Sequence, residues 1–456
     1  MLDEDLSDIP MTVAGLLAAY RSGATTPAAV IARVLEKIRE RGDDGVWITV
    51  ADRAMLDARL REVADLPRDL PLWGIPFGVK DSLDVRGWPT TLACPGWSRV
   101  ATDTAPAVQA LLDAGAVMIG KNNLDQFATG LNGTRSPYGI PRSVFDDEMI
   151  SGGSSSGSAV AVALGEVPFA VATDTAGSGR VPPALNGIPG FKPSRGLIST
   201  VGLVPACRSL DCVSLIAGTV DDLATVFDVV SGVDERDAWS RPRRRTTMPA
   251  PEARIGLPEA DELDFFGDDA VRQAHLAARD AIAGAFPERR QVPLAPFLAA
   301  GELLYQGPWV AERYLEFGDF MAGHPDAVHP VVAGIIASGA QYTAVDVFRA
   351  QYRMAELRAE VGRIFEEVDV LVLPTIGTTF TVAQVLADPV ATNTTLGHYT
   401  HFGNLLDLCA LTVPTGVTAD GRPSAAMILG PALSDDLVLR VGAAVAALPH
   451  ALAPVH

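Results

Sequence analysis

Two serine-bearing runs carry the residue types that nucleophilic catalysis needs. The first is SGGSSSGS at residues 151–158 and the second is DTAGSGR at residues 174–180, which places Ser154 and Ser178 24 residues apart. The apolar stretch between them, residues 159–172, predicts a helix followed by a strand, so the second serine should return beside the first. A serine attacks a carbonyl carbon only when a neighbouring base accepts its proton.

The candidate bases in this half of the chain are lysines. All seven histidines lie between His275 and His456, and Lys80 is one of only four lysines in the chain. Lys80 ends the apolar run 75–79, where burial would lower the pKa of its amine from about 10.4 toward neutrality. A Ser-Ser-Lys arrangement of Ser178, Ser154 and Lys80 fits this inventory better than a Ser-His-Asp triad, although a distant histidine could fold back.

The glycine- and serine-rich run has two simpler interpretations. Such runs are often flexible linkers, and a glycine-rich turn before a helix can also bind phosphate. The apolar flanks, residues 149–150 and 159–164, disfavour a linker. Neither a Lys-Ser/Thr pair nor a GxGxxG pattern follows, which disfavours phosphate binding.

Three motifs in order resemble the amidase signature family: GIPFGVKD at 74–81, GGSSSGS at 152–158 and DTAGSGR at 174–180. Other runs resemble the allophanate hydrolases within that family, among them NLDQFATG at 123–130, LYQGPWVAERY at 304–314 and NLLDLCAL at 404–411. The likeness covers nearly the whole chain. Departures are Asn122, Gly187 and Pro189. Such family members commonly carry a further C-terminal domain, and none is expected within residues 1–456.

The resemblance implies a role for each residue of the triad. Ser178 is expected to be the nucleophile, Ser154 to relay its proton to Lys80, and the peptide bond before Ser154 to be cis. Lys121 and Lys192 are expected to be structural. The family pattern involves no metal ion and no organic cofactor.

The turn around Ser178 is expected to form the oxyanion hole. Its donors would be backbone N–H groups of Thr175, Ala176, Gly177 and Ser178, because small residues let the backbone approach a carbonyl oxygen. Asp174 and Arg180, at the two ends of the motif, fit either a salt bridge that braces the turn or a direct catalytic role.

The resemblance also implies a small anionic amide as substrate. Tyr305 and Arg313 would hold its carboxylate and urea-like end, and their separation of eight residues, about two helical turns, could place both on one side of one helix. The alternative is that both are ordinary helix residues and that Arg313 pairs with Glu312 or Glu316. Contacts to the substrate's nitrogen end, through side chain or backbone, are expected from Asp125, Gln126 and Gly130.

The fold class expected is α/β, the amidase signature fold: a mixed central β-sheet covered by helices on both faces. Apolar runs predict strands at 74–79, 117–119, 169–173, 370–373 and 410–413, and helical spacing predicts helices at 27–41 and 105–114. Residues 1–456 are expected to form a single domain, with a mostly helical, substrate-covering segment at about 255–365. The charged, proline-rich stretch 234–254 predicts an exposed connection with a solvated basic run.

Composition limits the partners. A net charge of −19 and a pI near 4.7 argue against a nucleic-acid surface. The stretch 159–172 is too short to cross a bilayer, and the acidic N-terminus is unlike a secretory signal, so a cytoplasmic protein without membrane contact is expected. The four cysteines, without a CxxC pair, are expected to be buried thiols.

The resemblance implies hydrolysis of the terminal amide of allophanate (N-carboxyurea), with release of ammonia, in urea degradation. The resemblance further implies a homodimer and a functional link to a biotin-dependent urea carboxylase. The alternatives are another amidase signature enzyme acting on small amides, a non-catalytic scaffold and an amidotransferase A-type subunit. The acidic pI disfavours a tRNA-linked role, and an intact Lys80, Ser154 and Ser178 disfavour a scaffold.

Overall fold

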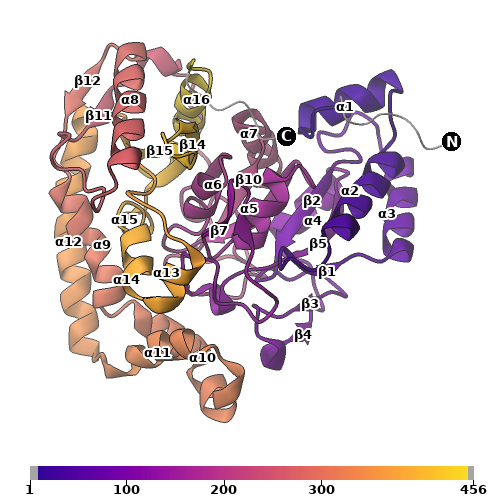
Figure 1. Ribbon diagram of the computed structural model, residues 1–456, viewed down its shortest axis with the longest axis horizontal. Coiled ribbons are helices and arrows are strands. Elements are labelled where there is room, and N and C mark those ends of the chain that lie inside the picture. Colours follow the sequence, from indigo (N-terminus) through magenta and orange to yellow (C-terminus); the bar gives the residue numbers. More distant parts are fainter. Residues whose placement is uncertain (1–8, 450–456) are drawn as a thin grey trace.

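The short apolar runs form one large mixed sheet in the computed structural model, which describes residues 9–449 (Figure 1). Within those residues the strands lie in the order β1 (Trp47–Val50), β5 (Val117–Asn122), β2 (Pro76–Lys80), β8 (Phe169–Asp174), β10 (Cys212–Ala217), β9 (Gly190–Lys192), β14 (Cys409–Val417), β15 (Pro423–Gly430), β13 (Val370–Pro374), β11 (Ile255–Leu257) and β12 (Arg289–Gln291). β2 is parallel to β5 and β8, β11 is parallel to β13 and β12, and the other neighbours are antiparallel. Every predicted strand is present.

Both faces of the sheet are covered, as predicted. In β13, Val370 and Val372 pack into one hydrophobic cluster, whereas Leu371 and Leu373 pack into another. Successive side chains of a strand point to opposite faces, so the two clusters are the cores on the two sides of the sheet. Two small hairpins, β3 (Pro89–Thr90) with β4 (Arg99–Val100) and β6 (Arg142–Ser143) with β7 (Asp146–Ile150), lie outside the main sheet.

Helices surround the sheet, and Figure 1 shows α1–α3 at the opposite end of the molecule from α8 and α12. Their bounds are α1 (Val13–Ser22), α2 (Pro27–Arg41), α3 (Arg53–Asp65), α4 (Pro106–Asp113), α5 (Ser156–Ala163), α6 (Val181–Leu185), α7 (Val220–Val230), α8 (Asp269–Ala285), α9 (Ala295–Gln306), α10 (Val310–Gly323), α11 (Pro330–Ala337), α12 (Ala344–Glu367), α13 (Val382–Ala387), α14 (Ala391–Leu396), α15 (His401–Leu405) and α16 (Asp435–Ala446). The predicted α2 begins where the Thr26 side chain accepts a hydrogen bond from the N–H of Ala29, with Pro27 at its first position.

The helix and strand predicted between the two serine runs are α5 and β8. α5 leads away from the first run and is buried along its whole length, and β8 returns to end at Asp174, where the second run begins. The segment 255–365 holds α8 to α12 together with the short strands β11 and β12.

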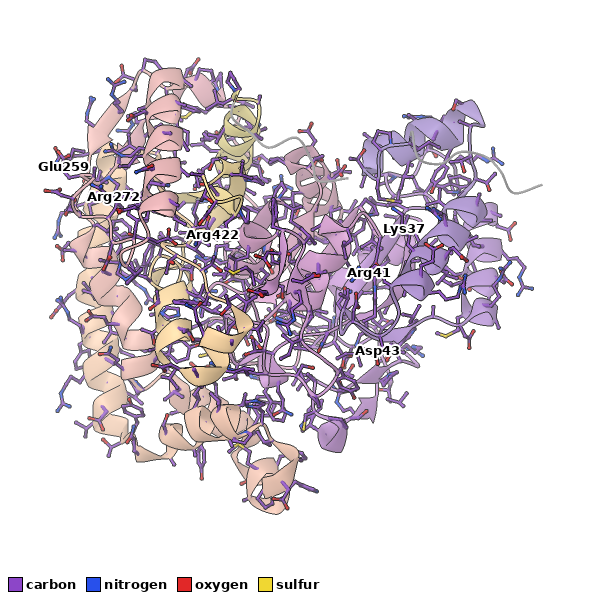
Figure 2. All side chains as sticks on the ribbon, viewed as in Figure 1. Lys37, Arg41, Asp43, Glu259, Arg272 and Arg422 are labelled. Atoms are coloured by element: carbon purple, nitrogen blue, oxygen red, sulfur yellow. The ribbon has the colours of Figure 1, made fainter. Side chains whose placement is uncertain are left out.

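Ion pairs tie elements that are distant in sequence, and Figure 2 labels two of the arginines that form them, Arg41 and Arg422. Arg41, at the end of α2, lies 2.8 Å from the buried Glu166 that follows α5. Arg422, in the turn between β14 and β15, reaches the two carboxylate oxygens of Asp268 at 2.6 and 2.9 Å, and Asp268 caps α8.

The prediction that the basic run at 241–245 is simply solvated is wrong for two of its arginines. Arg241 bonds the carboxylate of Asp407 at 2.8 and 3.0 Å. Arg243 bonds Asp436 at 2.8 Å through Nε and covers the ring of Phe227 at 4.2 Å. The physical reason is that long arginine stems pack on apolar surface while their guanidinium groups find carboxylates on other elements.

The four cysteines are free and buried, as predicted. Among residues 9–449, no single helix is long and apolar enough to cross a membrane. Only the pair formed by residues 330–341 and α12, bent by 96° at the break, meets that length and composition together.

Candidate active site

Lys80 occupies the last position of β2, and its side chain is fully buried. Its Nζ lies 2.8 Å from Ser154 Oγ, 2.9 Å from Ser155 Oγ and 2.8 Å from Thr173 Oγ1. Three hydroxyl groups thus surround the amine, and one of them belongs to the predicted relay serine.

Burial lowers the pKa of Lys80 to about 7, because the ammonium form loses its hydration. The negative charges of Asp125, Asp174 and Asp211 oppose this shift, and the positive charge of Arg313 adds to it. A lysine with a pKa near neutrality is partly uncharged at pH 7 and can accept a proton.

Ser154 lies between Lys80 and Ser178. The Oγ atoms of the two serines are 2.9 Å apart, so amine, hydroxyl and hydroxyl form one hydrogen-bonded chain. The Gly153–Ser154 peptide bond is cis, as the family resemblance implied. The side chain of Ser154 is completely inaccessible to solvent, whereas Ser178 retains 3% exposure. Ser178 is therefore the end of this hydrogen-bonded chain that a substrate can reach.

Asp174 and Arg180 brace the turn that carries Ser178. Asp174 accepts hydrogen bonds from the N–H groups of Gly177 at 2.9 Å and Gly179 at 3.0 Å. Arg180 grips the same carboxylate with two parallel bonds of 2.9 Å each. Burial would raise the pKa of Asp174, but the charge and hydrogen bonds of Arg180 leave it below its ordinary value. The geometry therefore fits the bracing role and not a direct catalytic one.

Three of the four predicted oxyanion donors remain available. The N–H of Gly177 is already donated to Asp174, which removes Gly177 from the set, because a buried carboxylate needs that donor. The N–H groups of Thr175, Ala176 and Ser178 have no protein acceptor within residues 9–449. A Cβ on Gly177 would lie 2.3 Å from Thr400 Oγ1, so only glycine fits there.

Tyr305 and Arg313 lie on two different helices, so the prediction that one helix carries both is wrong. Tyr305 is near the end of α9 and Arg313 is in the first turn of α10. Between them Gly307 and Pro308 end the helix, since proline cannot donate the N–H that would continue it. The ring of Tyr305 packs 5.0 Å from that of His401.

Arg313 is a buried cation, 3% exposed, whose Nη1 donates to Thr129 Oγ1 at 2.8 Å. The alternative partners predicted for it are engaged elsewhere: Glu312 bonds Ser209, and Glu316 lies 3.5 Å from Arg208. No carboxylate within residues 9–449 forms an ion pair with Arg313.

The side chains of Asp125 and Gln126 are tied to the protein backbone. Asp125 accepts the N–H of Arg135 at 2.9 Å, and Gln126 accepts the N–H of His329 at 2.6 Å. A Cβ on Gly130 would lie 2.6 Å from Asp125 Oδ2, so these residues do meet. These hydrogen bonds hold both side chains in place, and contact of Asp125, Gln126 and Gly130 with a substrate stays a prediction.

Two residues close to the triad were missed. Thr173 bonds Lys80, and Asp211 accepts the hydroxyl of Thr175. A polar residue near the end of the otherwise apolar strand β8 was the available signal for Thr173. Asp211 carried no such local signal, because its position depends on the pairing of β10 with β8.

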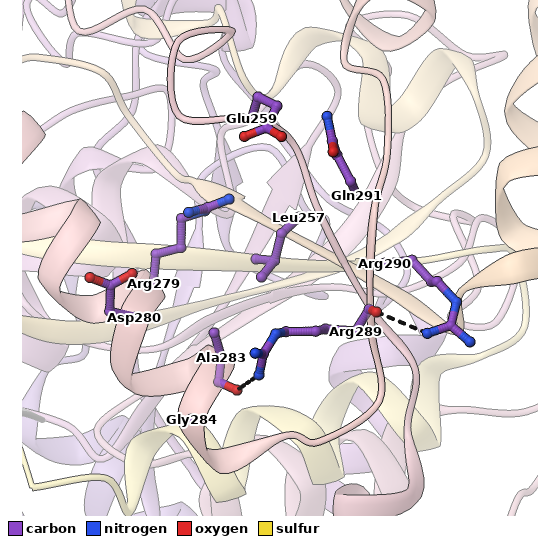
Figure 3. A pocket seen from close by; sticks show the side chains of 9 residues that line it. All are labelled: Leu257, Glu259, Arg279, Asp280, Ala283, Gly284, Arg289, Arg290 and Gln291. Carbon is purple, nitrogen blue, oxygen red and sulfur yellow. Dashed lines mark hydrogen bonds between the residues drawn. The ribbon is translucent and has the colours of Figure 1, made fainter.

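Two further observations on the described residues add nothing to the candidate active site. A hollow between α8 and the β11–β12 edge is lined by Leu257, Glu259, Arg279, Asp280, Ala283, Gly284, Arg289, Arg290 and Gln291, and contains none of the predicted site residues (Figure 3). Within residues 9–449 there is no group of three His, Cys, Asp or Glu side chains that could hold a metal ion.

Comparison with known proteins identifies the family of the chain. The family described as amidase matches residues 33–439. A urea amidolyase from Lachancea kluyveri is 40% identical over 90% of this chain and 23% of its own length, so the chain spans about a quarter of that relative. The solved structure of Kluyveromyces lactis allophanate hydrolase has 36% sequence identity to this chain and superposes on it with a TM-score of 0.88. The match covers 96% of this chain and 73% of the hydrolase chain. The A-type subunit of a glutamyl-tRNA(Gln) amidotransferase from Symbiobacterium thermophilum is 34% identical over 87% of this chain and 88% of its own.

The match over residues 33–439 and the shared fold define the class of this protein. The chain belongs to the amidase family.

Proposed function

We propose that this protein hydrolyses the terminal amide of allophanate, with Ser178 as nucleophile, Ser154 as proton relay and Lys80 as base. The observation that carries the proposal is the hydrogen-bonded chain from Lys80 through Ser154 to Ser178, with steps of 2.8 and 2.9 Å. The likeness to an allophanate hydrolase over nearly the whole chain supports the choice of substrate.

The chemistry follows from the geometry. Ser178 Oγ bonds to the terminal carbonyl carbon while its proton passes to Ser154 and the proton of Ser154 passes to Lys80 Nζ. The N–H groups of Thr175, Ala176 and Ser178 stabilise the negative oxygen that forms. Collapse breaks the carbon–nitrogen bond, the relay returns the proton to the leaving nitrogen, and ammonia departs. Water then attacks the acyl-enzyme by the same path and releases the carboxylated product.

The environment of Arg313 supports the proposal that the substrate is an anion. A guanidinium that is buried without an ion-pair partner among the described residues is suited to gripping a carboxylate with two parallel hydrogen bonds. Tyr305 would lie at the same end of the substrate. The chain carries a net charge of −19 and repels anions overall, so it needs such a local anchor.

Release of ammonia from a panel of amides tests this proposal. The purified protein should release ammonia from allophanate far faster than from acetamide, propionamide or glutamine. Preference for a neutral amide would favour a broad amidase, and preference for glutamine would favour an amidotransferase A-type subunit, which the match to such subunits keeps as the second candidate. No activity on any of them, from a folded protein, would favour a scaffold.

We also propose a cytoplasmic homodimer linked functionally to a biotin-dependent urea carboxylase. Free buried thiols suit a reducing compartment. Val345, Phe348 and Tyr352 form an exposed apolar stripe on α12 that a second copy could cover. The match to a urea amidolyase supports the link to urea breakdown. Light scattering should give twice the mass of the chain, and Phe348→Glu should halve it.

A further inference from the structure

Asp211 lies at the strand end that meets the nucleophile turn. The first residue of β10, Cys212, pairs with Asp174, the last residue of β8, in an antiparallel register. The next residues outward, Asp211 and Thr175, therefore lie opposite each other, and Thr175 Oγ1 donates a hydrogen bond to Asp211 Oδ1. Thr175 is the first residue of the turn that ends at Ser178.

The Asp211 carboxylate also holds the loop before β10. Its Oδ2 accepts the N–H of Ala206 at 2.9 Å and the N–H of Cys207 at 3.0 Å. Backbone N–H groups cannot accept, so this oxygen must be an acceptor. The other carboxylate oxygen, Oδ1, faces the Thr175 hydroxyl. Because that hydroxyl can donate or accept a hydrogen bond, either an acceptor or a donor fits at the position of Oδ1. One carboxylate thus joins the nucleophile turn to a neighbouring loop.

The carboxylate of Asp211 is buried, and it interacts electrostatically with Lys80 and with Arg313. It is 3% exposed and forms no ion pair within residues 9–449. Burial raises its pKa to about 6, while its hydrogen bonds and the positive charge of Arg313 from α10 favour the ionised form. Its negative charge in turn raises the pKa of Lys80 from β2 and those of the thiols of Cys207 and Cys212.

We propose that Asp211 is a positioning residue for amide hydrolysis. Through Thr175 it aims the N–H groups of the turn at the oxygen that becomes negative, and its negative charge acts with those of Asp125 and Asp174 to favour the protonated form of Lys80. This inference rests on the proposed function, because it concerns the same site.

Labelling by a fluorophosphonate tests the positional part without any assumption about the amide substrate. Ser178 Oγ bonds to phosphorus, fluoride leaves, the serine proton enters the relay, and the phosphoryl oxygen occupies the oxyanion hole. Thr175→Val removes the hydroxyl at nearly constant volume, so labelling of the full chain should slow roughly 10- to 100-fold. Thr175→Ser keeps the hydroxyl and should stay within about threefold of the unmodified protein.

A matched control is available. Thr200 donates its hydroxyl to Asp237 at 2.9 Å, also on loops, but Asp237 touches none of the site residues. Thr200→Val should label at the unmodified rate. If the unmodified protein labels on Ser178 and Thr175→Val labels at the same rate, the positional role is overturned while the proposed function stays intact. Failure of the unmodified protein to label on Ser178 overturns both.

Asp211→Asn tests the charge. Its Oδ1 can face the two backbone N–H groups while its Nδ2 donates to the Thr175 hydroxyl, so the contacts survive and the charge does not. Loss of a negative charge lowers the pKa of Lys80, so the pH midpoint of labelling should move down by roughly half a unit or more. Thr175→Val keeps the charge and should leave the midpoint in place, as should Asp237→Asn. An unmoved midpoint in folded Asp211→Asn overturns the electrostatic role.

Discussion

The hydroxyl oxygens of Ser154 and Ser178 lie 2.9 Å apart although 24 residues separate them in the chain. α5 leads away from the first serine and β8 returns to the second, and β8 lies parallel to β2, which ends at Lys80. The helix and the returning strand thus place nucleophile, relay and base within one hydrogen-bonded chain.

Ser178, and not Ser154, should form the covalent intermediate. Ser178 is the serine with residual exposure, and the free N–H groups of its turn can stabilise the attacked oxygen. Mass spectrometry of peptides after treatment with a serine-directed phosphonate should find the adduct on Ser178. An adduct on Ser154 instead would reverse the two assignments.

Lys80→Ala should reduce kcat by several orders of magnitude while the protein still folds, because the relay loses its proton acceptor. Lys80→Arg should recover little, since arginine stays protonated at all usable pH values. Turnover and thermal unfolding should be measured together. Lys37→Arg is the matched control, because Lys37 only donates to the carbonyl of Gly165 at 3.3 Å. Near-normal turnover by Lys80→Arg would remove Lys80 from the mechanism.

The rate should rise with pH through about 7. The pKa of Lys80 is lowered to about 7 by burial, and only the neutral amine accepts a proton, so kcat/KM is low below this value and levels off above it. The slope of log kcat/KM against pH should be close to one on the acid side. A profile flat between pH 6 and 8 would contradict a lysine base.

Arg313→Ala should damage turnover of allophanate more than that of a neutral amide. Loss of a charge-assisted bond to a carboxylate costs about 1.5–3 kcal/mol, or roughly 10- to 150-fold in kcat/KM. The comparison needs both substrates on both proteins. Equal losses would mean that Arg313 supports the fold through Thr129, to which it is bonded at 2.8 Å.

Arg180→Lys should weaken the nucleophile turn. Lysine cannot reproduce the two parallel bonds of 2.9 Å to Asp174, so the buried carboxylate would lose part of its compensation. We expect a lower melting temperature, by several degrees, together with reduced kcat. An unchanged melting temperature would contradict the bracing role. Arg236→Lys, at an exposed pair with Asp234, is the control for an arginine–aspartate pair that matters little.

The amino-acid sequence by itself predicted the strands β2, β5, β8, β13 and β14 of the main sheet and the identity of the triad candidates. Apolar runs such as 169–173 and the glycine turns on either side are local signals, since strand periodicity and backbone freedom act over a few residues. Lys80 could be singled out because a lysine at the end of a buried run must lose hydration wherever the strand packs.

Only the tertiary structure decided which side chains meet. Thr173 reaches Lys80 because β2 and β8 are neighbours, and Asp211 reaches Thr175 because β10 pairs with β8 in one register. The break at Gly307 and Pro308 puts Tyr305 and Arg313 on separate helices, although their spacing of eight residues would also fit one helix. The surroundings of Arg243 likewise depend on a contact with Asp436, 193 residues away, because hydrogen bonding between distant elements is settled by what the whole fold brings near.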